Sequence, residues 1–290
     1  MPLSLYGEVL IQGFLTGLVY GLMALGLSVI FGIVRVVNFA HGEFAVLAMY
    51  AAFVVFGLLH VDPLVAALPV AAVFFVVGYA FQRTVVQPFV RRPQHEQFIL
   101  LVGFAIVLVN ALLILFGPEA RHVGIAWSYD SFALGPMFVD KTRVYAALAA
   151  VVLTGALFAF FRFTLAGVAI RACADNPTGA GVVGLDVKRI YATSFGLGLA
   201  CTGAAGAIMT VLFDMTPGLG PSLTLLAFTI VIVGGLGSMA GALAGGVLIG
   251  MVEALASVMI APSMKSLVSF GLLVIVLAVR PQGLLGKASA

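Results

Sequence analysis

The sequence predicts an all-α polytopic membrane protein with about eight or nine transmembrane helices, including broken or re-entrant segments. Hydrophobic residues make up 63% of the 290 positions and charged residues only 9%. Soluble domains usually carry about 25% charged residues, so this chain cannot assemble a water-soluble surface. Apolar stretches of about 20 residues, the length that crosses a bilayer as a helix, recur along the whole chain. Strand-like alternation is absent, which argues against a membrane β-barrel.

Nine apolar segments are candidates for spans, and we expect them to form a single transmembrane domain over residues 1–290. The first has no basic region before it and no small-residue cleavage site, so we expect it to be retained. The seventh and eighth, in "FTIVIVGGLGSMAGALAGGVLIG", fit either two short crossings or a re-entrant pair. The predicted spans are 9–31, 39–60, 63–82, 97–116, 144–162, 190–212, 222–237, 239–260 and 266–280.

Lys and Arg are distributed unequally between alternate loops. Because cytoplasmic loops carry the excess of Lys and Arg, the bias predicts an outside N-terminus, a cytoplasmic C-terminus and an odd number of crossings. The loop 163–189 is then cytoplasmic and the loop 117–143 lies outside. The richer side holds ten, Arg35, Arg83, Arg91, Arg92, Arg162, Arg171, Lys188, Arg189, Arg280 and Lys287, against Arg121, Lys141, Arg143 and Lys265.

Glycines recur every four residues in two spans. Gly13, Gly17 and Gly21 lie on the first, and the range 237–250 repeats the spacing late in the chain. Small residues at this spacing let helices approach closely in lipid, so helix packing is the simpler interpretation.

Two further glycines, Gly234 and Gly235, interrupt the seventh span and would leave backbone groups free near the membrane midplane. Broken helices are tolerated in membranes only where they are buried or line a cavity. We therefore regard Gly234, Gly235 and Gly237 as candidates for lining the path of a transported solute.

No pattern in the sequence indicates an enzyme. The segment "GLGSMA" fits the loose dinucleotide-binding pattern but lies inside a span, where no βαβ unit can form. The sequence contains no P-loop, no Ser-His-Asp set and no zinc-ligand set, and its two cysteines predict no disulfide framework and no metal site. We expect the chain to bind no cofactor, metal or nucleic acid.

The loop 163–189 contains the signals of a short helix. Asn176 is a good N-cap, Pro177 suits the first helical position, and Gly184 suits the residue that ends the helix. Arg171 precedes this helix and the basic pair 188–189 follows it. The element looks suited to docking a soluble partner, although a plain linker between two spans remains open.

Four polar residues are placed between two apolar spans in "RVVNFAHGEF". On a helix Asn38 and His41 share a face, whereas Glu43 points away and should meet a neighbouring helix, or Arg35 if the chain folds back. Gly42 would permit an irregular turn. Ionisable groups at membrane depth usually mark a pathway or a buried pair, so the cluster either joins the two spans or lines or gates a path.

Other polar residues inside the spans have simpler interpretations. We expect Glu253 to form an interhelical hydrogen bond. Gln12 and Asn110 should hold neighbouring helices together, with about 1 kcal/mol from each.

Three segments together resemble the LivH-type permeases, which are transmembrane subunits of bacterial ABC importers for branched-chain amino acids. They are "GLVYGLMALGLSVIFGIVRVVNFAHGEFAVLAMYAA", "GVAIRACADNPTGAGVVGLDVKR" and "FTIVIVGGLGSMAGALAGGVLIG", and "NFAHGE" is the most specific part. The resemblance covers nearly the whole chain.

The resemblance implies a bacterial inner-membrane machine with several subunits. The partners would be a second permease, usually LivM-type, two cytoplasmic ABC ATPases that use ATP and Mg²⁺, and a periplasmic substrate-binding protein. The family's coupling motif maps onto Ala172 to Gly184, including Asp175, Asn176 and Pro177, directly after Arg171. The cargo stays open among branched-chain and other amino acids, urea and amides. A self-sufficient small-solute channel is the alternative.

Overall fold

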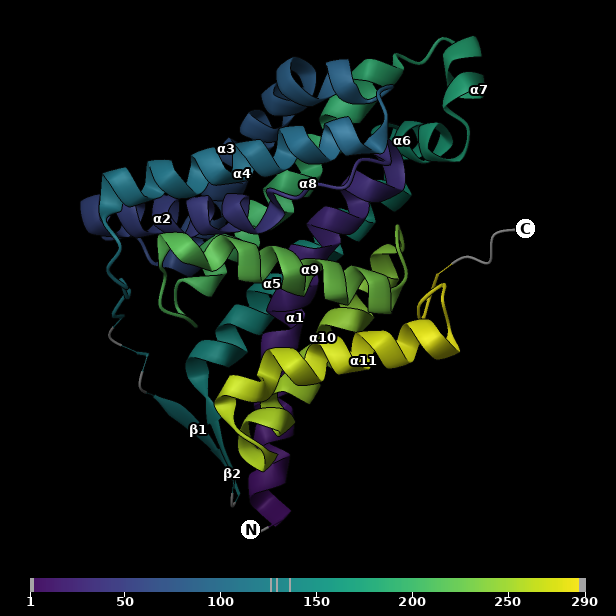
Figure 1. Cartoon of the computed structure of the whole chain (residues 1–290). Coiled ribbons are helices and arrows are strands. Elements are labelled where there is room, and N and C mark those ends of the chain that lie inside the picture. The colour runs from purple at the N-terminus through teal and green to yellow at the C-terminus, as the bar shows by residue number, and fades with distance from the viewer. Residues whose placement is uncertain (1–2, 126, 129, 136, 287–290) are drawn as a thin grey trace.

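The computed structural model describes residues 3–125, 127–128, 130–135 and 137–286. Figure 1 shows a body of helices with one small hairpin of strands at its edge. The α-helices are α1 (Leu3–Val34), α2 (His41–Leu59), α3 (Pro63–Phe81), α4 (Gln94–Phe116), α5 (Lys141–Phe163), α6 (Leu165–Asp175), α7 (Pro177–Val182), α8 (Val187–Met209), α9 (Gly220–Gly234), α10 (Met239–Met259) and α11 (Lys265–Val279). The short helical turns are η1 (Gln82–Val86), η2 (Gln87–Phe89), η3 (Pro217–Leu219) and η4 (Pro262–Met264).

The hairpin consists of β1 (Ser131–Leu134) and β2 (Met137–Asp140), which pair antiparallel with Ser131 opposite Asp140. The backbone N–H of Phe138 donates to the Glu8 carboxylate at 2.7 Å, so the hairpin is attached to the beginning of α1.

Each predicted span coincides with one helix to within a few residues. Eight helical segments in the described chain are long and apolar enough to cross a membrane, and α11 is a shorter apolar helix of 15 residues. The prediction of an all-α polytopic membrane protein is therefore confirmed.

Side-chain caps explain where several of these helices begin. Asp62 accepts from the N–H of Leu64, and Asp140 accepts from the N–H of Thr142. Asp186 accepts from the N–H of Arg189 at 3.1 Å at the beginning of α8. These carboxylates satisfy backbone donors that the first helical turn leaves unpaired.

Helices α1 and α10 run antiparallel in close contact. At one end, a Cβ on Gly32 would lie 3.3 Å from the Cα of Gly237, and at the other a Cβ on Gly13 would lie 2.7 Å from the Cβ of Ala254. These contacts are separated by 19 residues of α1, or about 28 Å of helix. Helix α10 therefore extends along most of the length of α1, and helix packing, the simpler interpretation of the spaced glycines, is confirmed.

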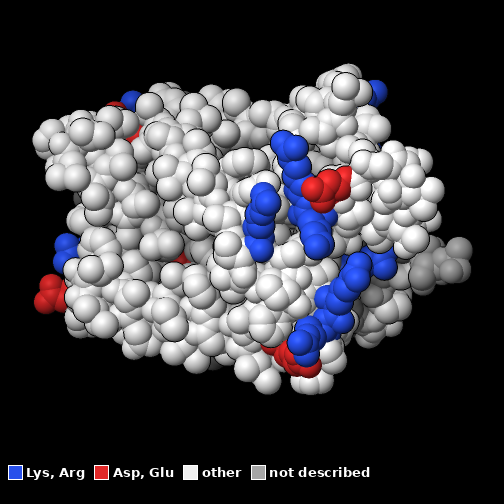
Figure 2. Space-filling view, turned by 90° about the horizontal axis from the view of Figure 1, so that it is seen from above, with Lys and Arg blue, Asp and Glu red and all other residues white. Residues whose placement is uncertain are grey.

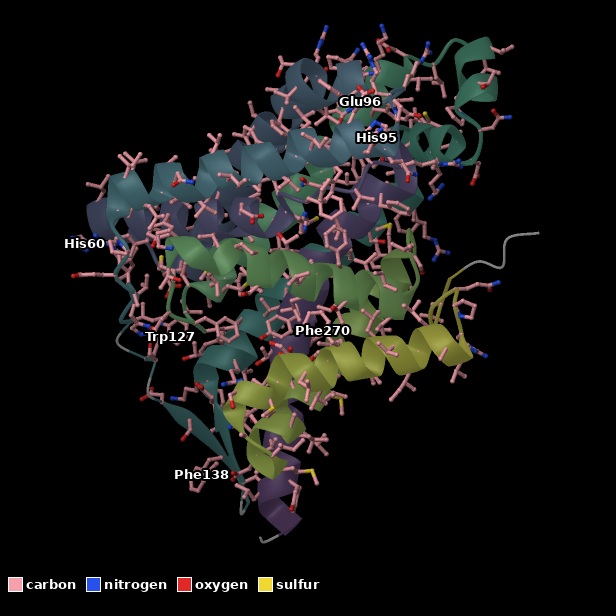
Figure 3. All side chains as sticks on the ribbon, in the orientation of Figure 1. His60, His95, Glu96, Trp127, Phe138 and Phe270 are labelled. Atoms are coloured by element: carbon pink, nitrogen blue, oxygen red, sulfur yellow. The ribbon has the colours of Figure 1, made fainter. Side chains whose placement is uncertain are left out.

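The helices alternate in direction between two ends of the molecule (Figure 1). The α7 end contains the last turn of α1, helices α6 and α7, and the segment 280–286. The hairpin end contains β1, β2 and the segment 210–219, where Arg121 and Met215 pair through their backbones. In Figure 3 His95 and Glu96 lie toward the α7 end, whereas His60, Trp127 and Phe138 lie at the other.

The charge asymmetry predicted for the loops is reproduced by the positions of the helix ends. Four basic residues lie at the hairpin end and nine described ones at the α7 end, while Lys287 lies outside the described residues. Figure 2 shows most of the visible Lys and Arg on the side that carries α7 and the C-terminal segment.

Candidate functional site

The segment 35–43 connects α1 to α2 and leads from the exposed Arg35 into the buried interior of the molecule. The chain leaves α1 at Val34, residues 35–40 are not helical, and α2 begins at His41. His41 Nε2 lies 3.0 Å from the carbonyl oxygen of Met23, which is 11 residues, or about 16 Å of helix, before the end of α1. The chain therefore returns along α1, and α2 begins near the middle of the helical body.

This geometry corrects two predictions about the segment. Asn38 lies before α2, so it shares no helix face with His41, and its Oδ1 accepts from the N–H of Ala40 at 3.2 Å. The turn depends on Arg35, whose φ of 59° is rare for a residue with a side chain. Gly42 lies inside α2 instead.

His41 joins three helices at the centre of the molecule. Its side chain is fully buried, and Nε2 lies 3.0 Å from the Met23 carbonyl of α1 and 3.3 Å from the Thr202 hydroxyl of α8. Nδ1 has no hydrogen-bond partner among the described residues. Because Nε2 must donate to the carbonyl, Nδ1 of a neutral ring is a free acceptor.

Glu43 contacts the beginning of α9, as the prediction of a neighbouring-helix partner required. The Thr224 hydroxyl donates to Glu43 Oε2 at 2.9 Å and accepts from the N–H of Gly42 at 2.8 Å. A Cβ on Gly42 would collide with the carbonyl oxygen of Gly220 and the backbone nitrogen of Thr224. Gly42 thus allows close approach of α2 to α9, and the alternative partner Arg35 forms no ion pair among the described residues.

Part of the backbone of this segment is unpaired. Within the described chain, the four N–H groups from Val36 to Phe39 donate no hydrogen bond. Val37 and Phe39 also line an apolar groove of about 300 Å³ with Phe228 and Val231 of α9. Unpaired backbone at membrane depth must be covered by protein or reached by water, and both a buried link between helices and a path lining meet this condition.

The predicted glycine interruption has a different position from the one expected. Gly234 ends α9, and Gly235 (φ 110°) and Gly237 (φ 77°) form the turn into α10 beside Gly32. This turn is at the α7 end and not near the midplane. Its carbonyls are not free either, because the N–H of Leu285 donates to Gly234 at 2.9 Å.

A cleft of about 840 Å³ opens at the α7 end, between α1, α6 and the α9–α10 turn. It brings together residues from both predicted groups, since Gly237 lies on one wall and Arg171 and Asp175 lie on α6 opposite. Ser28 and Arg35 line it from the α1 side. Along α1, Ser28 is five residues, or about 7.5 Å, from the Met23 carbonyl that contacts His41.

Helices α6 and α7 form a small hairpin that projects from this end (Figure 1). The cap predicted for α7 is confirmed, because Asn176 Oδ1 accepts from the N–H of Gly179 at 2.8 Å and Pro177 is the first helical residue. Gly184, with φ 87°, ends the element as predicted. The exposed surface of the hairpin includes Val182 and Val183, at 84% and 76% exposure.

The preceding helix α6 rests on the end of α5. Arg171 Nη1 donates to the carbonyl of Phe161, and Gly167 lies against the backbone of Phe160 and Phe161. Ala172 accepts the N–H of Asn176 at 3.0 Å. Cys173 is buried, and burial raises the pKa of its thiol, which fits a packing role rather than reactivity.

Comparison with known proteins places this architecture in a family. Residues 9–277 match the family described as "Branched-chain amino acid transport system / permease component". This chain belongs to that permease family. The permease is 30% identical to the Escherichia coli K12 high-affinity branched-chain amino acid transport permease LivH, over 95% of this chain and 94% of the relative.

More distant relatives extend the same match. The BraD permease protein of Pseudomonas aeruginosa is 28% identical over 97% of this chain and 96% of its own. A probable LivH permease of Methanocaldococcus jannaschii is 26% identical over 91% of this chain and 88% of its own. No solved structure matches the permease. The matched relatives are transport permease components, and the chain is a multi-pass membrane protein of their family.

Thr202 and Thr224 complete the buried polar cluster of the permease, and the sequence reasoning missed both. Each lies inside a predicted span and is at least nine-tenths buried. A hydroxyl inside an apolar Gly- and Ala-rich span was the available signal, but many such residues bond only to their own helix. Thr229, which donates to the Leu225 carbonyl at 2.9 Å, is one example.

Of the other polar residues inside the spans, one bonds to a neighbouring helix and another bonds to its own helix. Glu253 of α10 accepts from Ser269 of α11 at 3.0 Å, which confirms the predicted interhelical bond. Asn110 instead donates to the Ile106 carbonyl of its own helix at 2.8 Å, so that prediction was wrong. Gln12 makes no side-chain hydrogen bond within the part of the chain that the structure describes.

Proposed function

We propose that this chain is a transmembrane permease subunit of an ATP-driven importer for branched-chain or related neutral amino acids in the bacterial inner membrane. The single observation that carries the proposal is the α6–α7 hairpin. It is fixed by two side-chain caps, Thr164 on Gly167 and Asn176 on Gly179, and it exposes Val182 and Val183. A pore that works alone has no need of a rigid, exposed apolar helix beside its opening.

The charge distribution supports a cytoplasmic position for this hairpin. The basic residues are concentrated at the α7 end, and positive charge favours the cytoplasmic side of the membrane. The N-terminus and the β1–β2 hairpin would then lie in the periplasm, and residues 280–286 in the cytoplasm. The loop 163–189 would be the coupling loop and the loop 117–143 the periplasmic loop.

The partners that this arrangement requires are separate polypeptides. Two cytoplasmic ABC ATPases would supply ATP and Mg²⁺ chemistry. They would dock on the predicted coupling segment, which includes Arg171, Ala172, Asp175, Asn176, Pro177 and Gly184, through the exposed side chains of α7, while Arg171 and Asp175 face the cleft. A second, LivM-type permease would complete the membrane part, and a periplasmic binding protein would select the amino acid. The relatives are named for high-affinity branched-chain amino acid transport, which supports this cargo class.

Within the membrane, we place the transport path along the segment 35–43. The N–H groups from Val36 to Phe39 have no partner among the described residues, and Asn38, His41 and Glu43 offer neutral and acidic groups at the centre of the molecule. The cleft at the α7 end, which Gly237 lines, would be its cytoplasmic opening. Gly234 and Gly235 then shape the wall of that opening through the α9–α10 turn.

Co-purification tests the docking role of α7. The wild-type chain, extracted from its native membranes in mild detergent, should bring a second permease and P-loop ATPases. Val182→Asp with Val183→Asp should release the ATPases and keep the folded permease, because both side chains are exposed. The matched control is Phe138→Asp on the hairpin, 60% exposed, which should retain them.

Recovery of the wild-type chain alone, with leucine or urea passing through it in liposomes without ATP, would contradict the importer. That result would support a self-sufficient small-solute channel.

A further inference from the structure

The cleft at the α7 end has the composition of a small-molecule site. Its volume of about 840 Å³ lies within the range of ligand pockets, which are typically 300–1,000 Å³. Its walls come from α1, α5, α6 and the α9–α10 turn, and the segment near Leu285 also contributes. The wall combines apolar side chains with the polar residues Ser28, Arg35, Gln94, Arg171, Asp175 and Ser238, so it can contact both parts of an amphipathic ligand.

Opposite charges line the cleft without neutralising each other. Arg171 and Asp175 lie four residues apart on α6, and Arg35 faces the cleft from the end of α1. Among the described residues, none of the three belongs to an ion pair. Arg171 donates one N–H to the Phe161 carbonyl, which fixes the side chain and leaves other donors of the guanidinium unused.

Apolar side chains line the same cleft. Phe31 of α1, Phe161 of α5 and Ile170 of α6 all line the cleft. Ser28 lies deeper along α1, only 1% exposed, and its hydroxyl has no partner among the described residues. A buried hydroxyl without a partner is costly, so it marks a place where a ligand or water completes the hydrogen bonding.

We propose that this cleft is a binding site for a zwitterionic aliphatic amino acid on the cytoplasmic side of the permease. Arg35 and Arg171 receive the carboxylate, Asp175 receives the ammonium group, and the aliphatic side chain packs on Phe31, Phe161 and Ile170. The inference rests on the proposed function and adds to it a site of release, at which accumulated amino acid can hold the exit occupied.

Because α6 forms one wall of the cleft and leads directly into α7, movement of the α6–α7 hairpin would change this site. Arg171 and Asp175 belong to the helix that leads directly into α7, and the inner end of the cleft is about 7.5 Å along α1 from the His41 contact. A bound amino acid would therefore join α1 to α6, and movement of the hairpin would separate the two halves of the site. High internal amino acid should slow transport by this contact.

Equilibrium dialysis tests the site directly. The full chain in lipid nanodiscs, without ATP or partners, is dialysed against radiolabelled L-leucine, and 4-methylpentanoate and isopentylamine are tested as competitors. We expect saturable leucine binding that neither competitor displaces well, because each lacks one of the two charges. Arg35→Gln and Asp175→Asn should each raise the Kd for leucine at least tenfold, while Lys188→Gln, at the same end but outside the cleft, should leave it unchanged.

Two outcomes would overturn the inference. The first is that leucine does not bind saturably. The second is that 4-methylpentanoate or inorganic phosphate displaces the radiolabelled leucine as well as unlabelled leucine does, which would indicate a simple anion pocket. An Arg35→Gln,Asp175→Asn variant that melts at the wild-type temperature shows that lost binding is not lost folding. Recovery of ATPases with no leucine binding removes only this inference, whereas leucine binding with no ATPases removes the importer.

Discussion

Two buried regions of the permease are held together by opposite kinds of contact, one by backbone packing and the other by polar side chains. In the α1–α10 seam, which we define by Gly13, Gly17 and Gly21 against Gly246 and Gly250, two unbroken helices contact each other through backbone atoms. In the segment 35–43, the helix is interrupted and polar side chains make the contacts instead.

The difference indicates which region can change during transport. The seam has backbone hydrogen bonds satisfied inside each helix and close packing that tolerates no displacement. The segment 35–43 depends on a few side-chain bonds, from His41 and Thr224, and carries unpaired backbone that water can satisfy. We therefore assign the seam to the scaffold and the segment to the moving part.

The largest expected effect comes from enlarging a seam glycine. In Gly17→Leu the new Cβ would lie 2.7 Å from the Gly246 carbonyl oxygen and from the Val247 Cα. Both are backbone atoms of α10, so neither can move aside as a flexible side chain could. Overpacking of this kind costs on the order of 3 kcal/mol or more. We expect almost no monodisperse protein by size-exclusion chromatography, whereas Gly103→Leu on α4, where nothing lies within 4 Å, should purify normally.

Within the segment 35–43, Gly42→Ala should be the most harmful small change. Its methyl group would collide with the Gly220 carbonyl and the Thr224 nitrogen of α9. We expect a loss of about 1–3 kcal/mol in the free energy of unfolding. The same substitution at Gly57, on the same helix with open space around it, should leave the melting temperature unchanged or raise it, and equal destabilisation of both would contradict the close approach.

A smaller effect on stability, and a larger one on transport, is expected at Glu43. Glu43→Gln keeps an oxygen that accepts the Thr224 hydroxyl, so assembly should be normal, whereas Glu43→Ala removes that acceptor and should cost about 1–2 kcal/mol. If the segment lines the path, ATP-driven uptake per folded Glu43→Gln molecule falls severalfold. Normal uptake by that variant would leave the cluster as a structural link between helices.

The smallest effect belongs to Thr202. Its hydroxyl lies 3.3 Å from His41 Nε2 and donates to the Gly198 carbonyl, so Thr202→Val should cost about 0.6 kcal/mol. Thr193→Val removes a similar bond to its own helix at an exposed position of α8 and serves as the control. If the free energy of unfolding falls more in the control than in Thr202→Val, the contact with His41 does not contribute to stability.

The sequence predicted the helices of this permease well because hydrophobic length is a property of the chain alone. Each apolar stretch must span the hydrocarbon core, and caps such as Asn176 and Asp186 act within a few residues. The contact of Gly17 with Gly246 could also be expected, since the spacing of small residues repeats along a helix face.

The centre of the molecule could not be predicted in the same way. The return of residues 35–40 along α1 depends on the positive φ of Arg35 and on the Met23 carbonyl, neither of which has a sequence pattern. The Gly234–Gly235 interruption was placed too deep because periodicity does not reveal that the segment near Leu285 covers it. Contacts between distant segments, unlike helix lengths, require the packed structure.

Cysteine alkylation during ATP turnover tests the central claim that the segment 35–43 moves while the seam helices stay fixed. Ala40→Cys in the segment and Ala24→Cys in α1 start from equal positions, because both alanines are fully buried. In the complete transporter, with Cys173 and Cys201 replaced by Ala, a small water-soluble thiol reagent should modify Ala40→Cys only when ATP and substrate are present, and Ala24→Cys in no state. Modification of both positions, or of Ala24→Cys alone, would contradict the account.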